Sequence, residues 1–199
     1  MFGTPAAGTG CRARHRRESG PTIGAVSRHE VEIVALLVSP THAFEGRPQD
    51  GPRPDAAPVE RDRVEVRAGL GLVGDRYFNH RAHRNAAVTV FAAESLDALN
   101  LRPRPDPHVV RRNIVLRGFP VDDLVKQVFS LDSGDGPVRF QAHRPAHPCA
   151  WMDVVVAPGA FKGLRGHGGL RCVPLDDGVL RLGPTVLETS PADHVLTMA

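Results

Sequence analysis

The chain has 199 residues, of which 41% are hydrophobic and 24% are charged, and this composition excludes a wholly disordered or collagen-like protein. Its 20 glycines and 18 prolines favour short elements over long helical bundles, and it has no apolar run of the ~18 residues that a membrane-spanning helix needs. The net charge of +3 comes from residues 1–30, where five arginines stand against two acids, so the rest of the chain is about neutral.

The first predicted segment, residues 1–29, is a disordered arginine-rich tail, because large apolar residues are scarce in it. A single domain is predicted over 30–199. Residues 31–38 form a continuous apolar run that is typical of a buried strand. Residues 40–60 hold five prolines and predict a long loop, a feature that is often functional in a compact domain.

The remaining predicted elements are short. A glycine-rich turn is expected over 69–74, and short helical segments are expected over 92–99, over 121–125 and from Pro148 onward. Strands are predicted over 63–67, 88–91, 113–116, 127–131, 138–142, 170–175, 179–182 and 185–189. Many short strands with few short helices predict a mainly β fold of the barrel type.

The glycine-rich turn carries a G-x-G-x-x-G spacing from Gly69 to Gly74. A dinucleotide site would require a long helix after these glycines, and the polar residues that follow lack a helical period, so that interpretation is rejected. The turn presents Asp75 and Arg76, and an arginine fork suits a phosphate or carboxylate. An anion-binding turn and a purely structural turn with an Asp–Arg ion pair are equally compatible with these residues.

Two further groups of residues have chemical potential. Arg111, Arg112 and Asn113 precede a strand and are compatible with an anion site or with a solvated loop end. Cys149 follows Pro148 at an expected helix start and has His143, Arg144 and His147 nearby, which would favour the thiolate form. A buried cysteine that acts as a small apolar residue is the commoner case and stays open as the alternative. A zinc site made of the two histidines and Cys149 has a spacing that matches no usual zinc pattern.

The order of these motifs, G-x-x-G-D-R, then R-x-N, then P-C, resembles the MOSC domain, the C-terminal domain of molybdenum cofactor sulfurases. The resemblance covers about residues 31–189. It implies a MOSC-type β-barrel like that of pyruvate kinase. The matching residues are Gly71, Gly74, Asp75, Arg76, Arg112, Asn113, Pro148 and Cys149.

The resemblance also implies a ligand, the molybdenum cofactor, also called molybdopterin. Cys149 would be the metal ligand and, with Asp75, a catalytic residue. Gly71, Gly74, Arg76, Arg112, Asn113 and Arg144 would bind the cofactor and its anionic phosphate. Pyridoxal phosphate, which the sulfurases bind in another domain, is not expected in this chain.

The expected function is a cytoplasmic oxidoreductase of N-hydroxylated compounds. Two alternatives stay open: a sulfur carrier with a Cys149 persulfide for cofactor or metal–sulfur cluster maturation, and a non-enzymatic cofactor-handling module. The expected partners are a small-molecule cofactor and substrate, with a redox partner or a sulfur-donor protein. Nucleic acid is not expected, because no basic stripe interleaved with aromatics occurs. A membrane is not expected, because the chain has no apolar run of the ~18 residues that a spanning helix needs. The cytoplasm follows from the sparse set of three cysteines and the lack of a secretory signal.

Overall fold

The computed structural model describes Met1 and residues 26–189, and these form a mainly β fold. Seven strands close a barrel in the order β1-β10-β6-β7-β8-β4-β5, and a three-stranded sheet in the order β3-β2-β9 lies beside it. The barrel strands are β1 (Ser27–Leu36), β4 (Val88–Ala92), β5 (Ile114–Arg117), β6 (Val128–Asp132), β7 (Val138–Pro145), β8 (Leu170–Pro174) and β10 (Gly183–Thr189). The small sheet contains β2 (Arg63–Arg67), β3 (Gly71–Leu72) and β9 (Gly178–Arg181). The predicted β-barrel is confirmed.

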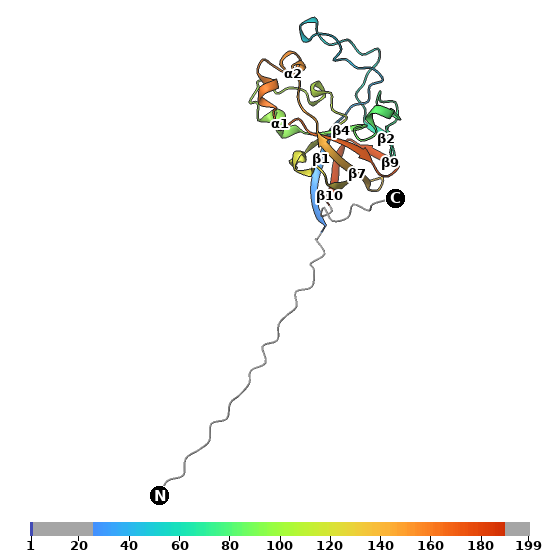
Figure 1. Ribbon diagram of the computed structural model, residues 1–199, viewed down its shortest axis with the longest axis vertical. Coiled ribbons are helices and arrows are strands. Elements are labelled where there is room, and N and C mark those ends of the chain that lie inside the picture. Colours follow the sequence, from blue (N-terminus) through green and yellow to red (C-terminus); the bar gives the residue numbers. More distant parts are fainter. Residues whose placement is uncertain (2–25, 190–199) are drawn as a thin grey trace.

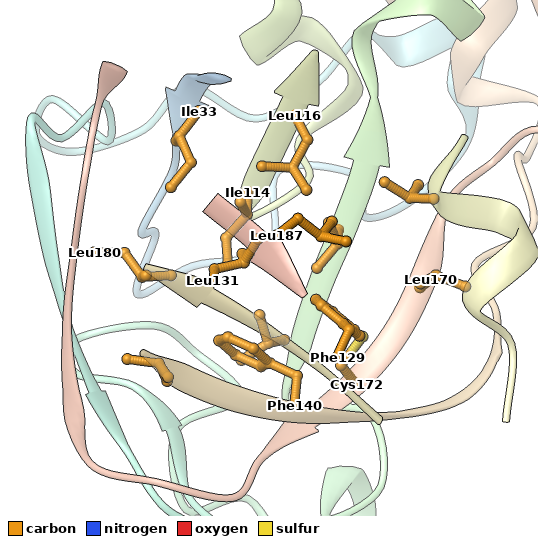
Figure 2. Packing of buried hydrophobic residues seen from close by; sticks show 14 of the residues in the cluster. Ile33, Ile114, Leu116, Phe129, Leu131, Phe140, Leu170, Cys172, Leu180 and Leu187 are labelled. Carbon is orange, nitrogen blue, oxygen red and sulfur yellow. The ribbon is translucent and has the colours of Figure 1, made fainter. Parts of the chain in front are cut away.

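Alternating apolar residues fill the barrel. In β7 the side chains of Val138, Phe140 and Ala142 are buried, while the residues between them are exposed or half-buried. Such a period of two places every second side chain on the same face of a strand. Figure 2 shows Phe140 among inward side chains of other strands, such as Phe129 and Leu131. The rings of Phe129 and Phe140 are stacked, with centroids 5.5 Å apart. The alternation therefore explains why this sequence closes a barrel.

A second apolar cluster lies outside the barrel wall, where three short helices cover it. The helices are α1 (Ala93–Asp97), α2 (Trp151–Val155) and α3 (Ala160–Gly163). Their buried residues pack with outward side chains of β4 and β5, such as Phe91 and Val115. Figure 1 shows α1 and α2 on the same side of the molecule as the long β1–β2 loop. Four 3-10 turns complete the fold: Pro48–Asp50, Arg81–His83, Pro107–Val110 and Val121–Leu124.

The β4–β5 pair is parallel, with Val90 opposite Ile114, whereas the other barrel pairs are antiparallel. Parallel strands begin at the same edge of a sheet. The residues that precede β5 therefore lie beside the start of β4, and this edge carries the candidate site.

The tail and the long loop can be compared with the predictions. Strand β1 begins at Ser27, and residues 27–29 pair with β10, so the predicted tail extends too far at its end. The cause is that Ser27–Glu30 are polar or exposed, so the sequence gives no apolar signal there. Residues 2–25 of the predicted tail lie outside the described residues. The predicted loop over 40–60 is confirmed, with one 3-10 turn within it.

Within the part of the chain that the structure describes, no helix is long and apolar enough to cross a bilayer.

Candidate functional site

A pocket of about 180 Å³ lies against the outer wall of the barrel at the edge where β4 and β5 begin. Thr89 of β4 and Arg171 of β8 form part of it and face each other across the strand pair. The pocket brings together residues from six separate parts of the chain. Its lining is His42, Ala43, Phe44, Arg76, Tyr77, Thr89, Arg111, Arg112, His147, Cys149, Trp151 and Arg171.

Cys149 lies at the rim of this pocket and is exposed. It follows the end of β7, and its carbonyl oxygen accepts a hydrogen bond of 2.9 Å from the backbone N–H of Met152. Helix α2 begins at Trp151 rather than at Pro148, and it has only five residues. The expectation that a helix begins at Pro148 is therefore wrong by three residues, and the turn at Cys149–Met152 takes the place of the expected first helical turn.

Arg112 holds the segment that carries Cys149. Its Nε donates to the carbonyl of Gly168 at 3.1 Å, and its Nη2 donates to the carbonyls of Ala146 and His147 at 3.3 and 3.4 Å. Arg112 is half-buried by surface exposure, yet the surrounding protein desolvates its guanidinium strongly and lowers its pKa to about 10, with Arg171 adding repulsion. A negative charge on Cys149 would oppose this shift. The guanidinium of Arg112, bonded to three neutral carbonyl groups, therefore lies in the same pocket as the thiol of Cys149.

Arg76 and Arg171 make no ion pair with an acid among residues 26–189. Arg76 lies over the Tyr77 ring at 4.5 Å, and its Nη1 donates weakly to the Thr41 carbonyl at 3.4 Å. The Nε of Arg76 is buried and has no partner within the described residues. Burial, followed by repulsion from Arg144 and Arg76, lowers the pKa of Arg171. A buried donor without an acceptor is costly, so Arg76 is suited to bind an anion, and Arg171 adds positive charge to the same pocket.

The long β1–β2 loop is tied to the pocket at two points. Arg111 donates to both oxygens of Asp55 at 2.7 and 2.9 Å, and the Phe44 ring stacks on Trp151 with centroids 5.2 Å apart. These hydrogen bonds hold the pKa of Asp55 below its ordinary value, with a smaller contribution from Ser39 in the same direction. Among the lining arginines, Arg111 is therefore the one whose charge the described residues neutralise.

Asp75 and Asn113, predicted as catalytic and cofactor-binding, lie beneath the pocket instead of in its lining. Asp75 is 5% exposed and accepts hydrogen bonds from the N–H groups of Ser39 and Tyr77 and from the Asn113 amide at 3.0 Å. Asn113 Oδ1 in turn accepts from Thr89. The two side chains join the loop after β1 to the turn of Arg76 and the start of β5, so they position the arginines that flank them.

Gly71 and Gly74 shape the turn that carries Arg76. Both have a positive φ, at 113° and 88°, and a Cβ on Gly71 would lie 3.1 Å from the Cβ of Ala87. An L residue rarely adopts this backbone conformation. Neither glycine lines the pocket, so what the two contribute is the shape of the turn that carries Arg76.

Arg144 also lies away from the predicted place. It is exposed and lines a separate hollow with Arg81, Arg84 and Lys126. The zinc alternative finds no support, because His143, His147 and Cys149 are not brought within ligand distance of one another in the described part of the chain. The carboxylates and imidazole that do approach within 4.8 Å belong to Glu60, Asp106 and His108. There the Asp106 carboxylate is engaged as the N-cap of a 3-10 turn.

Sequence reasoning missed several lining residues. Arg171 lies in β8 between the buried residues Leu170 and Cys172. Because side chains alternate along a strand, the sequence could have predicted that Arg171 lies on the outer face of the barrel. His42 and Phe44 lie in the loop, where no periodicity exists. Burial, followed by the charge of Arg76, lowers the pKa of His42, so this imidazole is neutral near pH 7. Its Nδ1 accepts from the Phe44 N–H at 3.1 Å, which leaves the proton on Nε2.

Comparison with known proteins adds three observations. The family model described as "MOSC domain" matches residues 77–185, more than half of the chain. The solved structure of the YuaD protein from Bacillus subtilis is 16% identical, with a TM-score of 0.63 over 84% of this chain and 100% of that one. YiiM from Geobacillus stearothermophilus is also 16% identical, with a TM-score of 0.53 over 79% of this chain and 74% of that one. At such identities the likeness shows the fold alone. The comparison with curated proteins gives no significant match.

Proposed function

The chain belongs to the MOSC domain family, and on that premise we propose that it binds the molybdenum cofactor beside Cys149 and reduces N-hydroxylated compounds. One observation carries the proposal. Arg76 and Arg171, which have no acidic partner among the described residues, flank the same pocket as the exposed thiol of Cys149. A soft metal ligand next to uncompensated guanidinium groups is the donor set that an anionic, metal-bearing compound requires.

The residues fit the two ends of such a compound. The buried Nε of Arg76 lacks an acceptor, and a phosphate oxygen would supply one. Arg171 would share the same negative charge. Arg112 is already engaged with three carbonyls, so its role is to fix the Cys149 segment rather than to be the main phosphate ligand. These roles differ from the expectation that Arg112 and Asn113 contact the cofactor.

The pocket has room to extend. A hollow of about 480 Å³ adjoins it and shares His42, Arg76 and Tyr77 with it. Together they offer space on both sides of Arg76, within the range of ordinary small-molecule sites of ~300–1,000 Å³. A pterin compound and a substrate therefore need not compete for the smaller pocket.

When bound, the cofactor would supply a metal centre that exchanges electrons and oxygen with a substrate. The chain supplies binding and protons. Cys149 would hold the metal as a thiolate, and the stacked rings of Phe44 and Trp151 would exclude water from one wall. Neutral His42 would offer its Nε2–H to an N-hydroxyl oxygen. Reduction of an N–OH group consumes two electrons and two protons and releases water, so an external electron donor is required.

The test is the metal content of the full chain purified from a host that makes the cofactor. We expect near-stoichiometric molybdenum in the wild type and in the control variant Cys11→Ser. We expect loss of the metal in Cys149→Ser, with the thermal unfolding midpoint of the metal-free proteins unchanged because Cys149 is exposed. Molybdenum that persists in Cys149→Ser, or is missing from the wild type, would contradict the proposal.

A second candidate, a sulfur carrier, is favoured by the exposure of Cys149, which a donor or acceptor protein could reach directly. In that role Cys149 would carry a persulfide and the arginines would bind the anionic acceptor. Cyanide-labile sulfur at Cys149 in protein without molybdenum would support it. If the wild type has no more cyanide-labile sulfur than the Cys149→Ser variant, the sulfur-carrier function is rejected.

A further inference from the structure

A second hollow, of about 380 Å³, has a lining that is dominated by cations and contains no acid. We call it the basic hollow. It is separate from the pocket of Cys149, yet the two are neighbours: Arg144 of the hollow stands opposite Arg171 of the pocket in the β7–β8 pair. The lining is Arg81, Ala82, Arg84, Asn85, Ala86, Lys126, His143 and Arg144.

None of the four cations of the basic hollow forms an ion pair with an acid among residues 26–189. Elsewhere on the surface arginines are commonly paired, as Arg139 is with Asp176 and Arg181 is with Asp135. The positive field of the hollow is felt by His143, whose pKa is lowered by burial and then by Lys126 and Arg144. Uncompensated charge of one sign attracts a partner of the opposite sign.

Two local irregularities of the backbone assemble the hollow. The β7–β8 register shifts between Ala142 and Arg144, which makes His143 an extra residue. Neighbouring residues of a regular strand face opposite sides, but this bulge lets His143 and Arg144 line the same hollow. Lys126 has a φ of 70°, which is strained for a residue with a side chain. Strain retained at one of two lysines in the chain is consistent with a role for that side chain.

The class of partner follows from exposure and composition. The six residues Arg81, Ala82, Arg84, Asn85, Lys126 and Arg144 are exposed, whereas a small-molecule site encloses most of its ligand. The lining has no Phe, Tyr or Trp on which a nucleic-acid base could stack. Exposed cations of this kind suit the carboxylates of another protein, because charge complementarity steers and orients such encounters.

We propose that the basic hollow is the docking surface for an acidic protein that serves the Cys149 site. Its identity as an electron donor with a carboxylate-rich face rests on the proposed function. The docking itself does not, because it depends on the charges of the hollow and not on the metal. Placement next to Arg171 would bring such a donor beside the pocket in which reduction is proposed.

The experiment uses an octaglutamate peptide as the acidic probe and isotope-labelled full chain, followed by backbone amide shifts in NMR. The test variant is Arg84→Glu/Lys126→Glu, and the matched control is Arg47→Glu/Arg63→Glu, two exposed arginines that line neither the hollow nor the pocket. We expect saturable shifts at Ala82, Asn85 and Lys126. We also expect the dissociation constant to rise about tenfold in the test variant and less than about twofold in the control. About 0.2 M salt should weaken binding in wild type and control.

Several outcomes would overturn the proposal: no saturable shift in the hollow, equal losses in test and control variants, or stronger binding there of inorganic triphosphate or oligothymidylate than of the peptide. If the charge-reversal variant does not fold, Arg84→Gln/Lys126→Gln replaces it, with an expected loss of about threefold. Molybdenum content is measured on the same samples. Peptide binding without molybdenum would support the docking surface and reject the proposed function. Molybdenum without peptide binding would support the proposed function and reject the docking surface.

Discussion

The arginines at the two ends of β7 differ in how their charge is balanced. Arg139, near the start of the strand, donates to both oxygens of Asp176 at 2.8 Å, and its neighbours Arg67 and Arg181 are also paired with acids. We call Arg67, Arg139 and Arg181 the paired rim. At the other end lie the Cys149 pocket and the basic hollow, where Arg111 alone among the described lining cations has a carboxylate partner. The charges of the paired rim are neutralised by neighbouring acids, whereas most arginines of the pocket and the hollow have no acidic partner among the described residues.

The largest effect is expected from Arg112→Gln, which removes the charged donor from three backbone carbonyls. Hydrogen bonds to a charged group contribute about 1.5–3 kcal/mol each, and buried acceptors left unpaired add to the loss. We expect the free energy of unfolding to fall by about 3 kcal/mol, against less than about 1 kcal/mol for the rim variant Arg139→Gln. Urea denaturation measures both. Equal losses would show that Arg112 is not the clamp described above.

Inorganic phosphate should stabilise the pocket next most strongly. A ligand that binds only the folded state adds about 2.7 kcal/mol at a concentration of 100 times its dissociation constant. We expect phosphate to raise the thermal unfolding midpoint of the wild type and of Arg139→Gln. The double variant Arg76→Gln/Arg171→Gln should gain only the general salt effect. A phosphate response that is the same in all three proteins would place the anion site elsewhere.

The Asp55–Arg111 pair, the exception within the pocket, predicts a pH dependence. Because Arg111 lowers the pKa of Asp55 in the folded state, the pair stabilises the protein above the unfolded pKa of ~3.9 and loses this effect as the pH falls through the folded value. We expect Asp55→Asn to cost about 1–2 kcal/mol at neutral pH and less at an acidic pH below ~3.9, where this contribution is being lost. Urea unfolding at both pH values checks this. A cost that does not change with pH would mean that the charge of Asp55 is not what holds the loop.

The smallest expected changes in stability have opposite signs in the Cys149 pocket and in the paired rim. Arg171→Gln relieves repulsion from Arg76 and Arg144, so we expect stability to rise by about 0.5 kcal/mol. Arg139→Gln breaks an exposed ion pair and should lower stability by about 0.5 kcal/mol. Salt near 1 M should reduce both changes. Chemical denaturation at low and high salt measures both changes in stability. A loss of stability in both variants would contradict the expected difference between the pocket and the paired rim.

The barrel was predictable from the sequence because its strands alternate or form short apolar runs. The predicted strand over 63–67 has the observed bounds, and those over 88–91 and 127–131 are within one residue of β4 and β6. The closure of the barrel and the parallel β4–β5 pair were not predictable, because pairing between distant strands leaves no local pattern. The resemblance supplied the barrel type.

The site was predictable in its motifs but not in its contacts. Cys149, Arg76 and Arg112 do meet in one pocket, because the turn before β4, the start of β5 and the end of β7 come together there. Asp75 and Asn113 are polar and close to these residues in sequence, yet they satisfy each other below the surface. Arg144 is diverted by the bulge at His143, a feature that depends on register with β8. Such distinctions depend on three-dimensional packing.

The central claim is that Arg76 and Arg171, which have no acidic partner among the described residues, bind an anionic molybdenum compound beside Cys149. The most direct measurement is the molybdenum-to-protein ratio of Arg76→Gln/Arg171→Gln and of the rim variant Arg67→Gln/Arg139→Gln, both purified from a host that makes the cofactor. We predict a near-stoichiometric ratio in the wild type and the rim variant, and loss of most of the metal in the pocket variant. Equal ratios in the two variants, or no molybdenum in the wild type, would contradict the claim.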